Sequence, residues 1–237
     1  MKQRAVIALA LSCKPKLIIA DEPTTALDVV IQDQILKEIR KVQDVLGLSL
    51  IYISHDIAVI AEMTDNMAVM YAGSIVEMGK TEKVFSNPKH AYTRMLLEST
   101  PSIVGPKKKL RSLDGEPPSL INTDSYCLFS YRCPSPDDNC RNRNIAMELT
   151  KIDSEHYADK CCINCGWNME NTLIEVKNLE KYFEISGGLF SRNKSIVKAV
   201  DGISFDIPFG SSLGLVGQSG CGKTTTARAL SLLDPKT

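Results

Sequence analysis

The fold is decided by residues 17–23, Leu-Ile-Ile-Ala-Asp-Glu-Pro, a short apolar run that ends in two acids and a proline. Runs of this length fit a strand buried on both faces of a parallel sheet. Pro23 cannot continue a central strand, so the strand ends there. The acids then lie at the C-terminal end of the strand, where open α/β sheets bind ligands. Asp21 is placed to hold Mg²⁺, directly or through water, and Glu22 to orient or deprotonate an attacking water.

A second motif occupies residues 217–224 near the other end of the chain. Its letters, Gly-Gln-Ser-Gly-Cys-Gly-Lys-Thr, follow an apolar run at 213–216 and precede a helical pattern at 225–233. A strand, such a loop and a helix form the P-loop pattern, in which backbone N–H groups surround phosphates at the positive end of a helix. We expect Lys223 to reach the β- and γ-phosphates and Thr224 to ligate Mg²⁺. The predicted nucleotide-binding residues are Gly217, Gln218, Ser219, Gly220, Cys221, Gly222, Lys223, Thr224 and Thr225.

The residues that follow Pro23 form an ordered series. Residues 24–28 are followed by an amphipathic helical pattern over Val29–Leu46, a strand at 49–53, and Ser-His-Asp at 54–56. This series resembles the nucleotide-binding domain of ABC transporters, in which a Walker B motif precedes a D-loop and a switch histidine. A lone histidine is more often structural, but the resemblance implies that His55 contacts a γ-phosphate and the water near Glu22. It also implies that Asp28 belongs to the nucleotide-binding set.

Other elements follow from periodicity and turn residues. Gly47 is a C-cap signal for the helix over Val29–Leu46. Strands at 66–71 and 74–78 are expected to pair through an Ala-Gly turn at 72–73. Three short helices are expected at Ile57–Met63, Thr81–Ser86 and Ala91–Glu98.

The last third of the chain reads as the start of a domain. Residues 173–176 begin a strand, and 178–183, Asn-Leu-Glu-Lys-Tyr-Phe, resemble the opening of an ABC nucleotide-binding domain, where an aromatic ring stacks on adenine. Phe183 fits that role by its spacing, with Tyr182 as the alternative, and either ring is also a normal core residue. Strands at 197–200 and 203–207 are expected to join through Asp-Gly at 201–202.

Six of the eight cysteines fall between residues 127 and 165. Thiolates bind soft metals, and four of them suit an iron–sulfur cluster or zinc. The spacing of Cys127, Cys133 and Cys140 resembles the cluster motif in the C-terminal extension of oligopeptide and dipeptide transporter ATPases. Residues 87–93 and 115–120 also resemble segments of these ATPases. The resemblance implies Cys161 as the fourth ligand, with Cys162 as the alternative. It favours a 4Fe–4S cluster over zinc, while unliganded reduced cysteines remain the third reading.

The motifs stand in the reverse of the order found in the resembled family, where the P-loop comes first. We therefore expect an α/β fold of the P-loop NTPase (ABC ATPase) type in two incomplete nucleotide-binding domains. Residues 1–100 correspond to the C-terminal part of one domain, 101–170 to a cysteine-containing extension, and 171–237 to the N-terminal part of a second. Residues 2–4, Lys-Gln-Arg, with a helix expected over Ala5–Ser12, resemble the segment just after the family's signature loop, and neither that loop nor a Q-loop is present. The alternative is one permuted domain, in which the strand before Asp21 neighbours the strand before the P-loop.

Composition restricts the partners. The formal charge is zero over 237 residues, which gives no electrostatic basis for binding nucleic acid. No apolar run approaches the roughly 20 residues of a membrane helix, and no signal peptide is visible. Contact with a membrane is therefore expected through partner proteins.

The resemblance implies an ABC-type ATPase that uses ATP and Mg²⁺ to drive peptide import. Its implied partners are transmembrane permease subunits, a second ABC ATPase domain and, indirectly, a solute-binding protein, on the cytoplasmic side of the membrane. The alternatives are a non-catalytic fragment that works through its cysteine-ligated metal, import of nickel or another small solute, and an unrelated P-loop enzyme.

Overall fold

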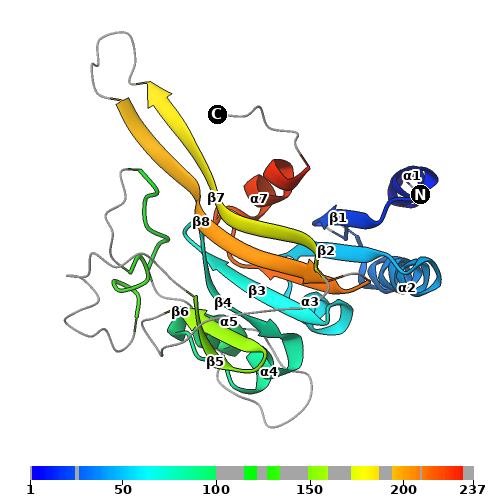
Figure 1. The fold of residues 1–237 in the computed structure, drawn as a ribbon, viewed down its shortest axis with the longest axis horizontal. Helices are drawn as coiled ribbons and strands as arrows, with labels where there is room; N and C mark the ends of the chain where they lie inside the picture. The colour runs from blue at the N-terminus through cyan, green and yellow to red at the C-terminus, as the bar shows by residue number, and fades with distance from the viewer. Residues whose placement is uncertain are drawn as a thin grey trace.

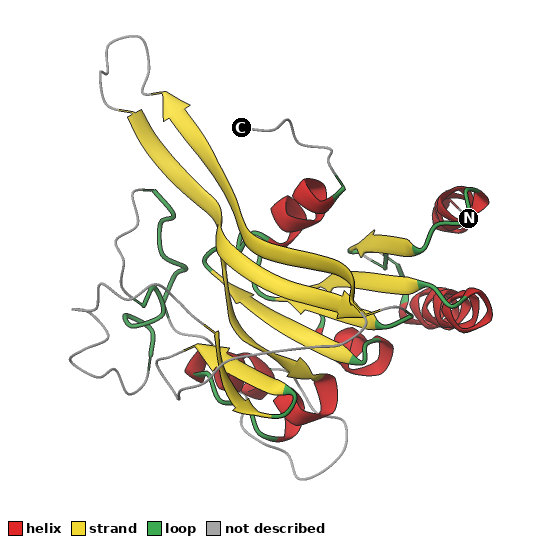
Figure 2. Cartoon of the chain, in the orientation of Figure 1, coloured by secondary structure: helices red, strands yellow, loops and turns green. Residues whose placement is uncertain are grey.

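The computed structural model describes residues 2–24, 27–99, 115–121, 127–133, 149–159, 172–186, 194–208 and 210–231 (Figure 1). Its main sheet has seven strands in the order β1-β2-β9-β3-β4-β6-β5, and a two-stranded sheet, β7-β8, crosses it (Figure 2). The strands are β1 Leu17–Asp21, β2 Ser49–Ser54, β3 Asn66–Tyr71, β4 Ser74–Lys80, β5 Leu149–Asp153, β6 His156–Asp159, β7 Thr172–Ser186, β8 Lys194–Pro208 and β9 Ser212–Val216. The helices are α1 Lys2–Ser12, α2 Val29–Leu46, α3 Ile57–Met63, α4 Thr81–Ser86, α5 Ala91–Glu98 and α7 Lys223–Leu230.

Helix α2 has the boundaries expected from its sequence. Asp28 caps its N-terminus by accepting a hydrogen bond from the backbone N–H of Ile31, which has no partner inside the helix. Gly47 ends it in the left-handed conformation, with φ of 62°, and its N–H bonds to the carbonyl of Gln43. These caps fix where the chain turns back into β2. The helices α3, α4 and α5 and the hairpin β3–β4 are likewise confirmed.

The strand that precedes the P-loop lies in the middle of the main sheet. Strand β9 pairs in parallel with β2 on one side, where Ile53 lies opposite Leu215, and with β3 on the other, where Ala68 lies opposite Leu215. The two ends of the chain therefore share one sheet, as in the permuted alternative. The expectation that the strands before Asp21 and before the P-loop are neighbours is wrong, because β2 separates them.

Strand β1 is less buried than its sequence suggests. Its residues Leu17–Ala20 are only half-buried, and among the described strands it pairs with β2 alone, so it forms an edge of the main sheet. The expectation of a strand buried on both faces is therefore wrong. The apolar run instead lines a cavity of about 370 Å³ shared with residues of α1 and α2, among them Val6, Leu11 and Val42.

Apolar side chains form a core on each face of the main sheet. One core contains Tyr52, Ile60 and Tyr92 and joins the sheet to helices α3 and α5. The other contains Leu215 and Phe205 and joins it to the β7–β8 sheet and α7. The sheet is thus covered by helices on one side and by the long β7–β8 pair with α7 on the other (Figure 1). None of the described helices is long and apolar enough to cross a membrane.

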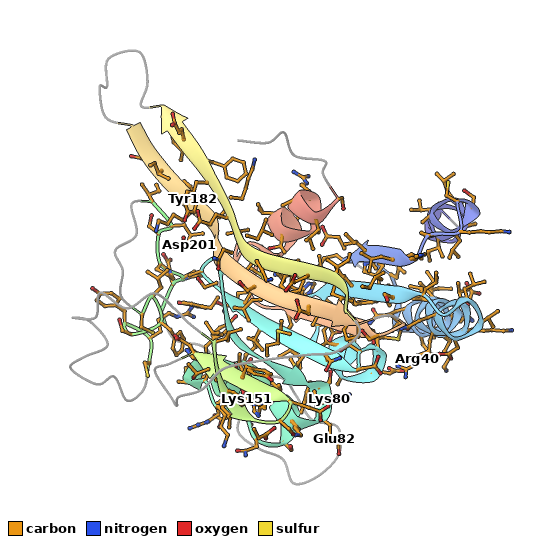
Figure 3. The ribbon with its side chains drawn as sticks, viewed as in Figure 1. Arg40, Lys80, Glu82, Lys151, Tyr182 and Asp201 are labelled. Atoms are coloured by element: carbon orange, nitrogen blue, oxygen red, sulfur yellow. The ribbon has the colours of Figure 1, made fainter. Side chains whose placement is uncertain are left out.

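Two parts of the fold differ from the sequence expectations. Residues 194–208 form one strand, β8, instead of two strands joined by a turn. Gly202 accommodates the chain with φ of 67°, and Asp201 is held by the Tyr182 hydroxyl and by Lys198 (Figure 3). In addition, residues 149–159, expected within an irregular extension, form the hairpin β5–β6, which extends the main sheet through β4.

A buried carboxylate ties this hairpin to the rest of the fold. Glu77 on β4 is 0 % exposed, and its oxygens accept hydrogen bonds from the backbone N–H groups of Lys89 (2.7 Å) and His90 (2.8 Å). Its Oε1 also lies 2.6 Å from Nε2 of the buried His156 on β6. One side chain therefore joins β4, β6 and the segment that starts α5.

Replacing Glu77 by alanine is expected to lower the free energy of unfolding by about 3 kcal/mol, because two backbone donors and a buried imidazole lose their acceptor. Urea denaturation of the whole chain measures this. The matched control is Glu155→Ala, which removes an exposed glutamate 3.8 Å from Lys80 and Lys83 and should cost no more than about 0.5 kcal/mol. Equal losses in the two variants would contradict the anchoring role of Glu77.

Candidate functional site

The two sequence motifs meet in one cleft. A cavity of about 570 Å³ is lined by Glu22 and His55 from the first part of the chain and by Gly217–Gly220 and Gly222–Thr225 from the last part. Leu96 and Ala199 complete the lining and were not indicated by any motif. The ends of parallel strands β1, β2 and β9 thus bring together the residues predicted for ATP binding and for water activation.

The loop at 217–224 is closely enclosed by backbone. A Cβ atom added to Gly217 would lie 2.3 Å from the Met70 carbonyl oxygen, and one added to Gly222 would lie 2.3 Å from that of Ala199. Gly222 also has φ of 102°, which side-chain-bearing residues rarely adopt. Glycine at both positions lets the loop curve inward, which is the backbone shape that surrounds phosphate oxygens.

Lys223 begins helix α7 and points back across the loop. Its Nζ donates hydrogen bonds to the carbonyl oxygens of Gly217 (2.8 Å) and Gln218 (2.9 Å), and the residue is only 6 % exposed. A buried ammonium group held inside the loop provides a positive charge where an anion would enter.

Glu22 and His55 form a pair at the mouth of this cleft. Glu22 has φ of 48°, and its N–H bonds to the Ile53 carbonyl at 2.9 Å, so the bend after β1 is tied to β2. Nδ1 of His55 lies 2.8 Å from each Glu22 carboxylate oxygen. The pair places a carboxylate base and an imidazole in the lining of the same cleft as the loop.

The residues predicted to hold Mg²⁺ also lie together. The Thr224 hydroxyl donates a hydrogen bond to Oδ1 of Asp21 at 3.3 Å, across 203 residues of sequence. A hydroxyl and a carboxylate are oxygen ligands that Mg²⁺ prefers. The donor set therefore fits this cation next to bound phosphate.

Cys221 lies within the loop but is protected from solvent. It is 5 % exposed, and this burial raises the pKa of its thiol despite the nearby Lys223 ammonium. The thiolate is the reactive form, so a raised pKa leaves less of it at any pH below that value.

A maleimide at pH 8 is therefore expected to label Cys221 at least about tenfold more slowly than the exposed Cys13 in the native chain. Peptide mass spectrometry gives the two rates, and the same measurement in urea should make them similar. Equal rates in the native chain would contradict the buried position of Cys221.

Three residues considered for nucleotide binding, Phe183, Tyr182 and Asp28, are not part of the described cleft lining. Phe183 on β7 is 44 % exposed, is not part of the cleft lining, and packs 5.5 Å from the Lys181 ammonium. Tyr182, the alternative adenine-stacking residue, bonds to Asp201. Asp28 caps α2. Among the described residues that line the cleft there are phosphate-binding groups but no Phe, Tyr or Trp ring to stack on a base.

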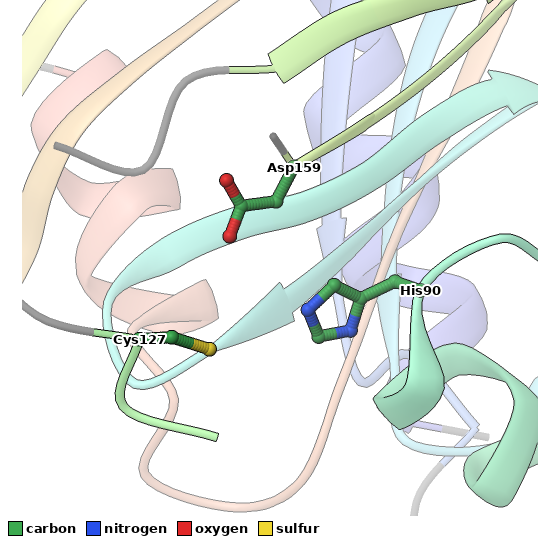
Figure 4. A group of neighbouring side chains, drawn as sticks. All are labelled: His90, Cys127 and Asp159. Atoms are coloured by element: carbon green, nitrogen blue, oxygen red, sulfur yellow. The ribbon is translucent and has the colours of Figure 1, made fainter. Parts of the chain in front are cut away.

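The cysteine ligands can be compared with the structure only in part. Cys127 and Cys133 lie at the two ends of a described turn and form no disulfide with another described cysteine, whereas Cys140, Cys161 and the alternative Cys162 lie outside the described residues. A different group surrounds Cys127, since its thiol, His90 and Asp159 offer ligand atoms within 4.8 Å of one another (Figure 4).

The ring of His90 restricts what this group can bind. Nδ1 accepts a hydrogen bond from the Tyr92 N–H at 3.1 Å, which caps α5. In the neutral ring the proton is then on Nε2, so that nitrogen has no lone pair for a metal unless the cap is broken. With the His90 ring in this role as a helix cap, the group is not arranged as a formed metal site.

Comparison with known proteins agrees with these motifs. Residues 76–140 match the family model described as "Oligopeptide/dipeptide transporter, C-terminal region", and residues 200–237 match the model "ABC transporter". The first match covers part of the main sheet, α5 and the Cys127 turn, and the second covers β9, the P-loop and α7.

Similar curated proteins cover nearly the whole chain. Glutathione import ATP-binding protein GsiA from Pectobacterium atrosepticum is 39% identical over 232 residues, which is 97% of this chain and 32% of that protein. The proteins of the same name from Escherichia coli O6:H1 and Shigella flexneri are each 38% identical over 230 residues, again 97% of this chain and 32% of theirs. The chain spans about a third of the length of these relatives. The fold of the chain is of the P-loop ABC ATPase type, and nearly all of its sequence is similar to part of these glutathione import ATP-binding proteins.

Proposed function

We propose that the cleft between the loop at 217–224 and the Glu22–His55 pair binds Mg²⁺-ATP and hydrolyses it. The observation that carries this proposal is that residues from opposite ends of the sequence line one cavity with the chemistry of phosphate binding on one side and of water activation on the other. The names of the relatives, ATP-binding proteins of an import system, support the same activity.

The proposed roles follow from the contacts. The loop N–H groups and Lys223 hold the phosphates, and Lys223 exchanges its bonds to Gly217 and Gln218 carbonyls for phosphate oxygens. Asp21 and Thr224 hold Mg²⁺, which when bound offsets phosphate charge. Glu22 accepts a proton from the attacking water or orients it, and His55 holds the Glu22 carboxylate and contacts the γ-phosphate.

We propose that this activity drives import of a small peptide through membrane permease subunits, with a solute-binding protein as an indirect partner. The match to the peptide-transporter C-terminal region and the glutathione importers supports a peptide, and glutathione is itself a tripeptide. Nickel or another small solute is the second choice. The protein would then act at the cytoplasmic face of the membrane as a peripheral subunit.

We also propose that residues 1–100 and 171–237 derive from two successive nucleotide-binding domains, with the extension at 101–170 between them. The two family matches fall on different parts of the chain, and the relatives align across both. Residues of both parts line one cleft within this chain. An origin from two successive domains is therefore compatible with a single site built from both.

A metal in the extension is a separate proposal. Cys127, Cys133, Cys140 and Cys161 are the proposed ligands of a 4Fe–4S cluster, with zinc as the alternative, and the positions of Cys127 and Cys133 at the two ends of one turn support it. Iron, sulfide and zinc analysis of protein purified without oxygen tests it. Cys133→Ser should remove the metal, and equal metal content in this variant would contradict the ligand set.

The import proposal is tested with vesicles that contain the permease subunits and the purified ATP-binding protein. Uptake of a labelled dipeptide or of glutathione should require ATP on the side of the membrane where the ATP-binding protein is bound. Uptake of nickel without uptake of any peptide would select the second choice, and uptake that is independent of ATP would contradict the proposed function.

A further inference from the structure

The turn at residues 127–133 lies against the phosphate-binding loop, although no sequence motif connects them. Successive hydrogen bonds close this turn, from Ser130 N–H to the Cys127 carbonyl and from Arg132 N–H to the Phe129 carbonyl, each of 2.9 Å. Phe129, in the middle, is 1 % exposed. The turn is therefore packed onto the fold by its central ring, and Arg132 lies near its C-terminal end.

Phe129 belongs to an aromatic cluster with Tyr71 and Tyr92. Its ring centroid lies 5.2 Å from that of Tyr71 and 5.5 Å from that of Tyr92, both in edge-on packing, and the two tyrosines are 4.6 Å apart. Tyr71 ends β3, just before the residues that contact the loop, and Tyr92 is in the first turn of α5. Rigid ring packing of this kind fixes the positions of groups attached to it.

Two side chains of this region bond to Gln218, the second residue of the phosphate-binding loop. The Gln218 N–H donates to the Tyr92 hydroxyl oxygen at 3.0 Å. Nη1 of Arg132 donates to Oε1 of Gln218 at 3.2 Å and is 3.3 Å from the Tyr71 hydroxyl oxygen. Gln218 is therefore held through both its main chain and its side chain.

Arg132 is itself held in place. Its guanidinium lies 5.9 Å from the centre of the Tyr71 ring. Its side-chain Cγ lies 3.6 Å from the position a Cβ would take at Gly115, so the stem rests on that backbone. An arginine with a supported stem and a stacked guanidinium loses little freedom when it bonds.

We propose that Arg132 is a positioning residue of the nucleotide site, which fixes Gln218 and so makes nucleotide affinity depend on the turn at 127–133. This inference rests on the proposed function, because it assumes that the loop binds nucleotide phosphates. Its physical basis is preorganisation: a loop that is already held in its binding shape does not lose that freedom again when the ligand binds. Nucleotide affinity would then depend on the contact between Arg132 and Gln218, which are 86 residues apart in sequence.

The test is nucleotide affinity of the full chain, measured with fluorescent ATP and ADP, for Arg132→Ala, Gln218→Ala and the double variant. Each single change should weaken binding about three- to tenfold, because one charged hydrogen bond to the loop is lost. The double variant should be no weaker than Gln218→Ala alone, since both changes remove the same contact. Arg132→Lys, with a single donor group, should restore part of the affinity.

Arg40→Ala is the matched control, because that guanidinium bonds to the Glu62 carbonyl, lies outside the cleft lining and should leave affinity unchanged. If Arg132→Ala does not fold, Gln218→Ala still tests the contact from the other side without altering the turn. Unchanged affinity in Gln218→Ala, or additive losses in the double variant, would overturn the positioning role while leaving the proposed function intact. Absence of nucleotide binding in every protein, the unchanged chain included, would overturn both.

Discussion

Glu22→Gln is expected to reduce ATP turnover at least about 100-fold while ATP affinity stays within about twofold. Glutamine keeps the shape of the side chain and can accept a hydrogen bond from His55, but it cannot take a proton from water, and removing a general base costs about 10²- to 10⁴-fold. Because Glu22 lies outside the loop at 217–224 that is proposed to hold the phosphates, ground-state binding should remain. Phosphate release under saturating ATP, together with a separate binding titration, measures the two effects on the complete protein.

The control for this variant is Glu175→Gln, which neutralises an exposed glutamate that pairs with Lys177 at 2.6 Å on β7. It should change neither turnover nor binding. Normal turnover in Glu22→Gln would remove the assigned role, and a parallel loss of binding would show that the carboxylate supports the shape of the site instead of the chemistry.

Lys223→Ala is expected to weaken nucleotide binding about 100-fold. Among the described residues that line the cleft, the variant removes the only ammonium group, and two charge-assisted contacts are together worth about 3 kcal/mol. The loop carbonyls of Gly217 and Gln218 also lose their donor, so the empty loop should become less ordered. Titration with ATP and with ADP shows how much of the loss depends on the γ-phosphate.

Lys37→Ala is the matched control, since Lys37 is an exposed lysine on α2 that pairs with Asp33. Circular dichroism before and after melting separates a local loss from unfolding. Affinity that is unchanged in a folded Lys223→Ala variant would contradict phosphate binding by this loop.

Local signals predicted most of the elements correctly. The N-cap at Asp28 and the glycine at position 47 fix α2 through groups adjacent in sequence. In the loop at 217–224, Gly217 and Gly222 are explained by steric closeness to Met70 and Ala199, and Gly220 by its φ of 78°. For α2 the sequence signal and its physical cause are both local, whereas for the loop the signal is local and the close contacts come from distant segments.

Non-local pairing could not be predicted in the same way. Periodicity indicates that β9 is a strand but not that it enters between β2 and β3, because pairing partners depend on the whole sheet. Strand β6 has four residues, His-Tyr-Ala-Asp, which are too few for a periodic signal. It forms because it pairs with β4 and because His156 contacts the buried Glu77 carboxylate. Asp201-Gly202 is a strong turn signal, yet β8 continues through these two residues because it stays paired with β7, with a shift in register.

The same distinction applies to the candidate site. Glu22, His55, Asp21 and the P-loop residues were found by motif, whereas Arg132 and Tyr92 reach Gln218 from segments whose local sequence indicates nothing about phosphate. For Arg132 the available signal was only its position beside the cysteines. Phe183 fitted by spacing alone, and spacing does not determine which face of β7 lies near the cleft.

The central claim is that Asp21 and the P-loop, from opposite ends of this chain, form one nucleotide site. The most direct measurement is the Mg²⁺ dependence of ATP affinity in the unchanged chain and in Asp21→Asn, with the exposed Asp33→Asn as control. The unchanged chain and the control should bind ATP about tenfold more tightly with Mg²⁺ than without it, and Asp21→Asn should lose most of that gain because the Asp21–Thr224 pair no longer offers a carboxylate. An identical Mg²⁺ dependence in all three proteins would contradict the claim.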